Sequence, residues 1–517
     1  TKKERKRKPT APFITSTLQQ EAARKLGFTA KRTMMVAQQL YEGIDIGEGS
    51  TGLITYMRTD STTLAEEALS EIRQCIIDKF GPDNLPKENR TYKTKAKNAQ
   101  EAHEAVRPTS INQLPENIKN HLNKEQFQLY SLIWKRTMAS QMIDATLHTV
   151  AVDLSADNHI FRANGSTVVN PGFMAVYQED TDDKPKENDE KMLPPMEEGE
   201  KIKTEEIIAD QHFTEPPPRF NEASLIKKLE EFGIGRPSTY AAIISTLQQR
   251  DYVDMDNKRF IPTDIGRVVN TFLTEHFKQY VDYNFTASLE NFLDDIAAGK
   301  KNWIEVLNDY WQPFNKLIAE KGDTLTKDAV SQNRELGVDE ETGKPILVKI
   351  GRYGPYIQLG SVEDDKKPKF VGLLPHQSMH TITLEEAKQL LSLPRKLGLM
   401  DGKIPVSINV GRYGPYVKYG HEFASLGKDD DMFTITLERA TECIRQHEET
   451  QSKKVISEFP DSNIQVLNGR YGPYITDGEK NGKIPKEQNP AELTLEQCIE
   501  ILKNSKPSRF KRKKKDN

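Results

Sequence analysis

The sequence GLITYMRTDST, residues 52–62, combines a short apolar run, a tyrosine and a cluster of polar residues. The apolar run predicts a short strand that includes Tyr56. Arg58, two residues further on, would then lie on the same face of that strand as the tyrosine. The polar residues after it are expected to cap a helix that begins with LAEEALSEI at residue 64. The stretch therefore places a tyrosine and an arginine together at a junction between a strand and a helix.

The pattern on both sides of this stretch is mainly helical. The run STLQQEAARKLGFTAKRTMMVAQQLYEGI, residues 16–44, has apolar side chains at helical spacing, with Gly27 as a break. Further along, residues 145–156 and 159–169 alternate apolar and polar side chains, which predicts strands. From residue 221 the pattern is helical again. Asn221 is expected to cap a helix that ends at the glycines of FGIG.

The C-terminal part of the chain contains an internal repeat. The sequence GRYGPY occurs at residues 351–356, 411–416 and 469–474. A period close to sixty residues indicates three copies of one small unit. In each copy the Gly-Pro pair predicts a turn between two short strands, so a β-hairpin is the expected element.

Composition excludes several classes of protein. Hydrophobic residues make up 36% of the chain and charged residues 29%, which is typical of a soluble globular protein. No apolar run approaches the ~20 residues of a membrane helix, and the basic start precedes no apolar stretch. We therefore expect neither a spanning segment nor a signal peptide. The three cysteines form no C-x-x-C pair, which disfavours a disulfide framework or a cysteine zinc site and favours the cytoplasm.

The charge distribution leaves two interpretations open. The net charge of −4 does not by itself indicate a nucleic-acid-binding protein. Basic residues cluster at 2–8 and at 509–515, and acidic residues gather near 179–200 in a segment expected to be a mobile loop. Each basic cluster is either a solvated, disordered end or an arm that binds phosphate.

Three motifs in a fixed order indicate a family. They are GLITYMRTDST at 52–62, EAHEAVRPT at 101–109 and PPPRFNEASLIKKLEEFGIGRPSTYAAIISTLQQRDYV at 216–253. Together they resemble the signature series of the bacterial type IA DNA topoisomerase I family, and the resemblance covers nearly all of residues 10–325. The GRYGPY units resemble the zinc-free C-terminal repeats of that family. A single motif of this kind would be weak, but the ordered set is specific.

The resemblance implies an α+β multidomain fold in which helical domains and a strand-rich arch form part of a ring. We expect a basic linker and the end of the arch at 1–15, a helical domain with Tyr56 at 16–143, the arch domain with its acidic loop at 144–220 and a helical base domain at 221–325. Three small β-rich repeats follow at 326–390, 391–450 and 451–505, and a basic tail at 506–517.

The resemblance also implies an activity. Such an enzyme cuts one DNA strand, holds the ends, passes a strand through the break and reseals it, and so relaxes negatively supercoiled DNA without ATP. The sequence contains no P-loop pattern, in agreement with that. The implied partner is single-stranded or negatively supercoiled DNA. The implied setting is a monomer associated with the nucleoid in the cytoplasm.

The catalytic residues that the resemblance implies are Tyr56, Arg58 and His103. A tyrosine hydroxyl can hold the energy of a phosphodiester as a phosphotyrosine, here with the 5′ end of the broken strand. Arg58 would stabilise the charged phosphate in the transition state, and His103 would contact a phosphate near the cleavage site. Without the resemblance, Tyr56 would be interpreted as an aromatic residue of the core whose hydroxyl is hydrogen-bonded. His103 would be interpreted as a surface or core residue whose ring nitrogens are hydrogen-bonded.

Two further DNA-binding candidates flank these residues. Asp60 resembles an acid near the nucleophile, although helix capping explains it nearly as well. Arg107 follows His103 in the same motif, and because it precedes a proline it could instead serve only to end a helix.

The sequence GIGRPSTYA, residues 233–241, predicts a loop-to-helix junction at which a phosphate could bind. Pro237 suits a first helical turn, and the free N–H groups there would form an anion site. Arg236 would add charge, and Ser238 or Thr239 a hydroxyl, with Tyr240 beside them as a further DNA contact. The alternative is simple capping of the helix by Ser238.

Each repeat carries an arginine followed by a tyrosine, and a second tyrosine after Gly-Pro. These side chains would contact a phosphate and stack on unpaired bases. The alternative is that the tyrosines pack into each small core and that the motif serves only the turn. The candidate DNA-binding residues are Arg352, Tyr353, Arg412, Tyr413, Arg470 and Tyr471.

The family binds Mg²⁺ through an acidic cluster in an N-terminal domain, which also carries a lysine for acid catalysis. No D-x-D pattern at a strand end precedes Tyr56, so we expect the Mg²⁺ ligands to lie in an N-terminal domain outside this sequence. A rival interpretation follows, in which the chain is a non-catalytic fragment that binds single-stranded DNA. A site-specific tyrosine recombinase is disfavoured, because its tyrosine would lie near the C-terminus, after a spaced Arg-His-Arg set.

Overall fold

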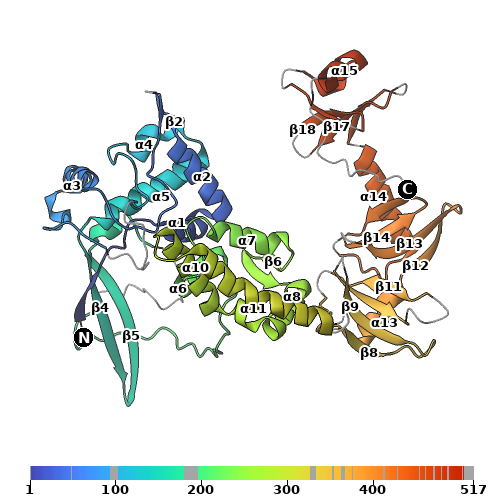
Figure 1. Cartoon of the computed structure of the whole chain (residues 1–517), viewed down its shortest axis with the longest axis horizontal. Coiled ribbons are helices and arrows are strands. Elements are labelled where there is room, and N and C mark those ends of the chain that lie inside the picture. Colours follow the sequence, from blue (N-terminus) through green and yellow to red (C-terminus); the bar gives the residue numbers. More distant parts are fainter. Residues whose placement is uncertain are drawn as a thin grey trace. The chain divides into compact units, whose positions relative to one another are not determined.

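The structure is a computed structural model of the chain (Figure 1). It describes residues 2–47, 49–92, 103–179, 196–325, 333–351, 354–361, 367–374, 377–411, 414–427, 429–452, 454–459, 462–469, 472–478, 480–485, 488–503 and 505. The chain divides into two compact units, Thr1–Thr326 and Lys327–Asn517.

The first unit contains a three-stranded antiparallel sheet in the order β1-β4-β5. Its strands are β1 (Lys2–Arg7), β4 (Ala145–Ala156) and β5 (His159–Asn170). The two predicted strands of the arch are confirmed as the long β4–β5 hairpin, which projects from the helices in Figure 1. The interpretation of the basic cluster at 2–8 as a disordered end is wrong for residues 2–7, because β1 pairs with β4 along its whole length, from Lys2 opposite Val150 to Arg7 opposite Ala145.

A helical part is built around one large apolar core. Its helices are α1 (Thr15–Glu21), which continues as η1 (Ala22–Leu26), then α2 (Ala30–Glu42), α3 (Glu66–Phe80), η2 (Pro82–Asn84), α4 (Pro115–Ile118), η3 (Lys119–His121) and α5 (Lys124–Ser140). The predicted break at Gly27 is confirmed, with a φ of 68° that favours glycine. A small hairpin of β2 (Ile44–Asp45) and β3 (Ser50–Thr51) leads into the tyrosine segment.

The strand and the helix cap expected around Tyr56 are both wrong. Among the described residues 52–65 only isolated bridges occur, such as that of Ile54 with Pro108. The helix α3 begins at Glu66, and its N-terminal capping residue is Ala65, which has no capping side chain. The polar residues before it bond with each other and with other segments instead: the Ser61 N–H donates to the Thr59 hydroxyl, and the Thr59 N–H donates to the Thr15 hydroxyl.

A second helical part follows η4 (Gly172–Ala175). It contains α6 (Glu222–Phe232), α7 (Tyr240–Gln249), the hairpin β6 (Val253–Asp256) and β7 (Arg259–Pro262), α8 (Asp264–His276), α9 (Lys278–Val281), α10 (Tyr283–Ala297) and α11 (Trp303–Thr324). The predicted cap of α6 is confirmed, because the Asn221 side chain accepts a hydrogen bond from the backbone N–H of Ser224. The predicted end is also confirmed, with Gly233 at a φ of 72°.

The second unit contains three four-stranded antiparallel sheets, and a helix packs on each. The first has β8 (Arg334–Val338), β9 (Pro345–Gly351), β10 (Gly354–Leu359) and β11 (Lys369–Gly372), with α13 (Leu384–Leu391). The second has β12 (Arg395–Met400), β13 (Ile404–Gly411), β14 (Gly414–Tyr419) and β15 (Glu422–Ser425), with α14 (Leu437–Ser452). The third has β16 (Val455–Glu458), β17 (Gln465–Gly469), β18 (Gly472–Thr476) and β19 (Asn481–Lys483), then η5 (Pro490–Glu492) and α15 (Leu495–Lys503).

The hairpin predicted at each GRYGPY is confirmed, but the turn predicted at Gly-Pro is wrong, because the Gly-Pro pair begins the second strand of each hairpin, at Gly354, Gly414 and Gly472. In all three sheets the first and second glycines of the motif face each other across the turn: Gly351 and Gly354, Gly411 and Gly414, Gly469 and Gly472. The α+β fold, with three β-rich units at its C-terminal end, is therefore as expected from the sequence.

Candidate nucleophile site

Tyr56 lies in an irregular segment whose side chains alternate between core and surface. Met57 and Thr59 are buried, whereas Tyr56 and Arg58 are exposed, Tyr56 to 36%. The expectation that Tyr56 and Arg58 share one side of the backbone therefore holds for their exposure, although the segment is not a strand. Both side chains can be reached by a molecule in solution.

Thr15, the first residue of α1, holds this segment through hydrogen bonds. The hydroxyl of Thr15 lies 2.7 Å from the Met57 carbonyl oxygen and 3.0 Å from that of Thr59. The Thr59 N–H donates back to the same hydroxyl at 2.9 Å, and the Thr15 N–H donates to the Thr59 carbonyl at 2.9 Å. Because the hydroxyl hydrogen can serve only one carbonyl at a time, the 2.7 Å contact is the better of the two. These bonds hold the backbone on both sides of Arg58.

A second segment, 103–109, fixes the other end of the tyrosine segment. The Thr55 N–H donates to the Arg107 carbonyl at 2.9 Å, and the Thr55 hydroxyl donates to the Ala105 carbonyl at 2.7 Å. The Thr109 N–H donates to the Leu53 carbonyl at 3.0 Å. This pairing brings His103 next to Tyr56, with their ring centroids 6.0 Å apart.

A third ring, which the sequence analysis did not identify, completes the surroundings of Tyr56. Tyr41, near the end of α2, meets Tyr56 edge to face, with centroids 5.3 Å apart, and is itself 41% exposed. The chain passes close to α2 here: the Leu53 N–H donates to the Leu40 carbonyl at 2.7 Å, and a Cβ on Gly52 would lie 2.7 Å from the Tyr41 carbonyl oxygen. The glycine that opens the motif was the only sequence signal of this approach.

The described surroundings of Tyr56 combine a half-exposed phenol, an imidazole and a guanidinium. A phenol oxygen can attack a phosphorus atom, and a nearby cation can stabilise the charge that develops on the phosphate oxygens. The arrangement is therefore suited to phosphoryl transfer with a polyanion that approaches from solution.

Arg107 is occupied within the protein. Its guanidinium forms a two-pronged ion pair with Glu104, at 2.6 and 3.1 Å, and also donates to the Pro108 carbonyl at 2.9 Å. Burial would raise the pKa of Glu104, but the hydrogen bonds and charge of Arg107 outweigh it and hold that pKa below its usual value. The helix-ending alternative is wrong, because the segment is extended and bridges Phe13 through Val106.

Asp60 lies on the side of the segment that faces the second helical part. Burial raises the pKa of Tyr240 above its ordinary value, and the charge of Asp60 is among the smaller contributions to that rise. The capping alternative for Asp60 is wrong, because α3 begins six residues later. The structure thus brings residues 60 and 240 into electrostatic range of each other.

The loop-to-helix junction at 233–241 differs from the expected anion site. The helix α7 begins at Tyr240, and Pro237 lies before it in a turn. The Gly235 N–H donates to Glu290 at 3.1 Å and the Arg236 N–H to the Thr239 hydroxyl at 2.8 Å. In the turn after Pro237, where the sequence predicts free N–H groups, the Thr239 N–H donates to the Arg236 carbonyl at 2.9 Å and is not free for an anion.

The side chains of the same junction also differ from those of the expected anion site. The Arg236 guanidinium donates to Asp294 at 2.7 Å, so a phosphate would have to displace that carboxylate. Ser238 is exposed and does not cap α7, contrary to the capping alternative. Tyr240 is buried, and a Cβ on Gly235 would lie 2.9 Å from its ring. In this state Tyr240 is a core residue, not a surface contact.

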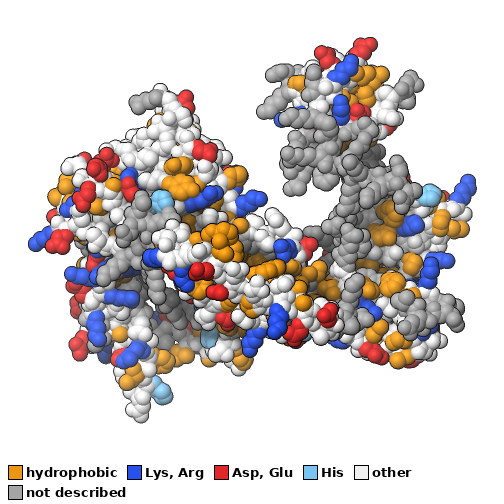
Figure 2. Space-filling model, in the orientation of Figure 1, with side chains coloured by type: hydrophobic (Ala, Val, Ile, Leu, Met, Phe, Trp, Pro, Cys, Tyr) orange, Lys and Arg blue, Asp and Glu red, His pale blue; other side chains and the backbone are white. Residues whose placement is uncertain are grey.

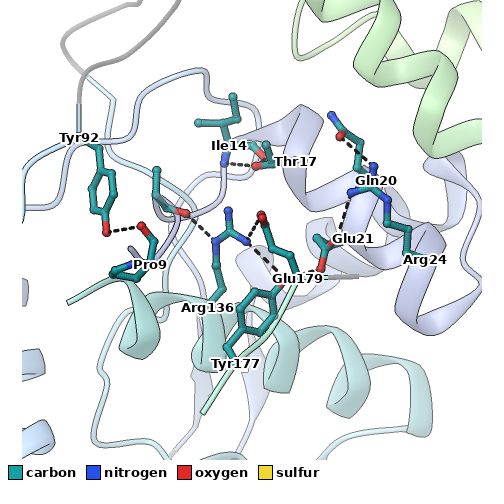
Figure 3. A network of polar contacts seen from close by, with 11 residues as sticks. Pro9, Ile14, Thr17, Gln20, Glu21, Arg24, Tyr92, Arg136, Tyr177 and Glu179 are labelled. Atoms are coloured by element: carbon teal, nitrogen blue, oxygen red, sulfur yellow. Dashed lines mark hydrogen bonds and ion pairs between the residues drawn. The ribbon is translucent and has the colours of Figure 1, made fainter. Parts of the chain in front are cut away.

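The helix α1 also joins the tyrosine segment to the rest of the unit. At its far end, Glu21 accepts a hydrogen bond from the Tyr177 hydroxyl (Figure 3). Buried Arg136 of α5 donates to the Ala11 carbonyl and to Glu179, both at 2.6 Å. The network thus ties the segments that enter and leave the β-sheet to α5 and α1.

A polar contact connects α1 and α2 with α6. The Glu222 carboxylate accepts a hydrogen bond from the Ala30 N–H at 2.6 Å, and the Gln20 side chain donates to Glu230 at 3.3 Å. Burial raises the pKa of Glu222 above its usual value. Ala30 also packs in a small apolar cluster with Ile226 and Tyr240, so the two helical parts share a mixed interface.

In the repeats, Arg352, Tyr353, Arg412, Tyr413, Arg470 and Tyr471 lie outside the described residues. The second tyrosine of each motif is described, and its role is partly structural. A Cβ on the first glycine would lie 2.8–3.1 Å from the ring: Gly351 against Tyr356, Gly411 against Tyr416 and Gly469 against Tyr474. A side chain larger than that of glycine at this position would therefore press against the tyrosine ring.

The described residues contain neither a metal-binding cluster nor a membrane-spanning helix. No group of three or more His, Cys, Asp or Glu side chains there is arranged to hold a metal ion. Within the same residues no helix is long and apolar enough to cross a membrane.

Two family models match the chain. Residues 1–308 match the family model described as DNA topoisomerase. Residues 339–399, 401–454 and 459–513 match the topoisomerase C-terminal repeat.

Individual relatives are also similar over most of the chain. The chain is 54% identical to DNA topoisomerase 1 of Xylella fastidiosa (strain Temecula1) over 514 residues, which cover 98% of this chain and 63% of the relative. It is 44% identical to DNA topoisomerase 1 of Rickettsia felis, over 88% of this chain and 68% of that protein. The full-length topoisomerase I structure from Thermotoga maritima resembles it with a TM-score of 0.57 and 33% identity, over 73% of this chain and 59% of that one.

The Xylella fastidiosa protein thus has more than a third of its length outside the matched part. The family match spans more than half of the chain and includes Tyr56 with all the residues that surround it. The chain belongs to the bacterial type IA DNA topoisomerase I family.

Proposed function

We propose that this chain is the part of a type IA DNA topoisomerase that carries the nucleophile, and that Tyr56 cleaves one DNA strand through a 5′-phosphotyrosine. The observation that supports this most is the environment of Tyr56. Its ring is half-exposed beside His103, and Arg58 is exposed on the same segment. The family match of residues 1–308 includes all three.

The proposed reaction exchanges one phosphodiester for another. The Tyr56 oxygen attacks a backbone phosphorus, a bond between phosphorus and tyrosine forms, and the bond to the 3′ oxygen of the neighbouring nucleotide breaks. The tyrosine gives up its proton and the departing 3′ oxygen takes one up. Because the number of phosphate ester bonds is unchanged, resealing is the reverse step and requires no nucleotide.

Arg58 and His103 would act on the phosphate. The guanidinium of Arg58 would offset the negative charge that builds on the phosphate oxygens as the tyrosine attacks. His103, whose ring lies 6.0 Å from that of Tyr56, would hold a phosphate next to the one that is cut. The exposed position of Tyr56 leaves room for single-stranded DNA to reach both residues.

The wider activity follows from this reaction. A break held by the protein lets another strand pass, so the enzyme would relax negatively supercoiled DNA without ATP. The partner would be single-stranded or negatively supercoiled DNA, bound also by the repeats, and the enzyme would act as a monomer at the nucleoid in the cytoplasm. Asp60, Arg107 and the residues of the 233–241 junction would approach DNA only after the contacts they make here have rearranged.

The family uses Mg²⁺ for this chemistry. The described residues do not fit such an ion, because they contain no suitable cluster of carboxylates and histidines. We therefore assign the metal ligands to none of these residues and derive no step through the ion.

One alternative fits the same observations. The chain matches 63% of the Xylella fastidiosa relative, so it could bind single-stranded DNA without cutting it.

A plasmid relaxation assay distinguishes the enzyme that cleaves DNA from the fragment that only binds it. The chain joined to the remaining part of the relative should relax a negatively supercoiled plasmid with Mg²⁺, and the Tyr56→Phe variant should bind DNA equally well but relax none. Relaxation that survives in this variant would remove Tyr56 from the mechanism.

A further inference from the structure

The ring of Tyr41 lies beside that of Tyr56, although Tyr41 belongs to none of the three motifs that indicate the family. Tyr41 is the second-last residue of α2, whereas Tyr56 follows the β2–β3 hairpin. The ring centroids lie 5.3 Å apart and the ring planes meet at 65°, close to an edge-to-face arrangement. Such a pair is attractive, because the edge of an aromatic ring carries partial positive charge and its face partial negative charge. The contact therefore favours one orientation of the Tyr56 ring.

Exposure alone would give Tyr41 no role. Its side chain is 41% exposed, and hydrophobic side chains are visible at the surface of several parts of the first unit in Figure 2. Scattered apolar side chains of this kind are normal in proteins. What distinguishes Tyr41 is its contact with the candidate nucleophile, together with the way in which the two residues are held.

The helix α2 holds Tyr41 at a fixed place. Three apolar side chains from the second half of the helix are buried in the core: Val36, Ala37 and Leu40. A rotation of the helix about its axis would expose these side chains to water, which costs free energy in proportion to the apolar area exposed. The Tyr41 ring is therefore presented by a rigid element.

The backbone of the tyrosine segment is held against the same end of α2. The Leu53 N–H donates to the Leu40 carbonyl at 2.7 Å, three residues before Tyr56. A Cβ on Gly52 would lie 2.7 Å from the Tyr41 carbonyl oxygen, so the segment can come this close only because residue 52 is glycine. The two tyrosines are thus brought together by the backbone, independently of any DNA.

The side chain of Tyr56 needs support, because burial does not hold it. Its backbone is fixed through the bonds of Thr55, but its ring is 36% exposed. An exposed side chain changes rotamer within nanoseconds, and a change of χ1 would carry the reactive oxygen, at the far end of the ring, away from the phosphate. The ring of His103, at 6.0 Å, would contact the substrate under the proposed function. Among the rings that the structure describes around Tyr56, Tyr41 is therefore the one that can hold the phenol.

We propose that Tyr41 is a positioning residue for the nucleophile, and that its ring holds the Tyr56 phenol in the orientation from which the oxygen attacks. The inference rests on the proposed function of Tyr56. A nucleophile held in its attacking geometry reacts faster, because fewer of its orientations are unproductive. In the phosphotyrosine the bond to phosphorus keeps the phenol in that orientation, so Tyr41 stabilises this intermediate as much as the transition state. Tyr41 therefore accelerates cleavage but not resealing.

Two substitutions test the ring of Tyr41 separately from its hydroxyl. Tyr41→Phe keeps the ring, and Tyr41→Leu removes it but keeps an apolar side chain. The matched control is Tyr283→Leu, which removes an exposed tyrosine ring from a pair with Phe232 in the second helical part, centroids 4.9 Å apart. Each variant is made in this chain joined to the remaining part of the Xylella fastidiosa relative. Cleavage and resealing of a single-stranded oligonucleotide are measured in single turnovers at saturating DNA with Mg²⁺, and the affinity for it by titration.

Tyr41→Leu should cleave about threefold to tenfold more slowly, the factor that corresponds to the usual strength of an aromatic pair. Its rate of resealing and its affinity for the oligonucleotide should change by less than about twofold, because only the free phenol has lost its support. Tyr41→Phe and Tyr283→Leu should keep all three quantities.

Other outcomes would overturn the proposal. Unchanged cleavage in Tyr41→Leu would show that the Tyr56 ring is oriented without Tyr41. An equal loss of cleavage and resealing would make Tyr41 a structural residue of the site, and a loss of affinity as large as that of cleavage would make it a DNA contact. A loss in Tyr41→Phe as large as in Tyr41→Leu would assign the effect to the hydroxyl. Should Tyr41→Leu not fold, Tyr41→Met takes its place, since it also lacks a ring and suits a helix.

A measurement on this chain alone tests the orientation itself. Tyr56 is replaced by 3-fluorotyrosine, and the fluorine NMR relaxation reports how freely its ring moves. Tyr41→Leu should lower the transverse relaxation rate of this fluorine, because a released ring moves within nanoseconds, whereas Tyr41→Phe and Tyr283→Leu should not. Equal relaxation in Tyr41→Leu and the unchanged chain would overturn the proposal. If the unchanged chain joined to the relative's remaining part cuts no DNA, the proposed function fails, and the relaxation still decides whether Tyr41 holds the Tyr56 ring.

Discussion

At the scale of single residues, the candidate site depends on backbone bonds that join three distant segments. Thr15 fixes the carbonyls of Met57 and Thr59, and Thr55 fixes the segment that carries His103. Arg58 and Tyr56 are presented to solvent because the residues next to them are buried. The side chains that would meet the phosphate are therefore placed by a rigid frame, and their function should respond to small changes in that frame.

Arg58→Ala should lower the rate of DNA cleavage about 10²–10³-fold, because a preorganised charge stabilises the transition state more than the bound substrate. Binding of a single-stranded oligonucleotide should change by less than about threefold. The cleavage rate is measured under single-turnover conditions with this chain joined to the remaining part of the Xylella fastidiosa relative, which we call the joined protein. The affinity for the oligonucleotide is measured by a binding titration. Arg162→Ala, at an exposed arginine of the β-sheet, is the control. Equal losses of cleavage and binding would make Arg58 a simple binding residue.

The sequence predicted the identity of the site residues better than their surroundings. Tyr56, Arg58 and His103 could be named because their motifs resemble those of a family. The contact of Tyr41 with Tyr56 could not be predicted, because it depends on how α2 packs against a segment more than ten residues further along the chain. The sequence also gave no sign that Asp294 pairs with Arg236, since that carboxylate comes from α10.

At the scale of elements, α1 is a short helix with two separate contacts. Thr15 at its start holds the tyrosine segment, and Glu21 at its end meets Tyr177 beside the network of Arg136. The helix itself was predictable from its periodicity. The polar residues 59–62, which the sequence predicts as a cap for the next helix, instead form hydrogen bonds with each other and with α1.

Thr15→Val should reduce cleavage about tenfold to a hundredfold, because the backbone beside Arg58 loses its anchor. It should also destabilise the first unit by about 1–3 kcal/mol, since it leaves buried polar groups without a partner. The control is Thr33→Val, at a buried threonine whose hydroxyl bonds only within the start of its own helix. Cleavage kinetics and urea unfolding test the pair, and matching effects of the two variants would show that the anchor at Thr15 has no special role.

The glycines of the repeats make a second prediction about elements. Gly351→Ala should destabilise the first repeat by about 1–3 kcal/mol, because its Cβ would lie 2.9 Å from the Tyr356 ring and the ring would have to shift. Gly372→Ala in the same sheet should be nearly neutral, because nothing lies within 4 Å of its Cβ position. Hydrogen exchange of β9 and β10 measures both. Equal protection in the two variants would mean that the ring moves away freely.

At the scale of the whole molecule, the chain combines a topoisomerase core with three repeats. The order of motifs was enough to predict both parts and the α+β class. The resemblance implied the end of the arch within residues 1–15, but the sequence did not indicate that residues 2–7 form a strand, because a run of lysines and arginines has little strand pattern.

The repeats should bind single-stranded DNA better than duplex DNA. For the whole chain, the logarithm of the association constant should fall with the logarithm of salt by about 0.7 per phosphate neutralised. Tyr413→Ala should weaken binding by about 1–3 kcal/mol if that ring stacks on a base. Tyr416→Ala should instead destabilise the repeat, because Tyr416 lies over Gly411. Unchanged affinity in a folded Tyr413→Ala chain would mean that the repeats serve another partner.

The central claim is that Tyr56 joins the 5′ side of a broken strand, and the most direct test is to trap that bond. A single-stranded oligonucleotide labelled at its 3′ end is incubated with the joined protein and Mg²⁺, then denatured with detergent. The account predicts a labelled protein band whose modified peptide contains Tyr56, and a free fragment when the label is at the 5′ end instead. A covalent band with the 5′ label, or a modified peptide without Tyr56, would contradict it.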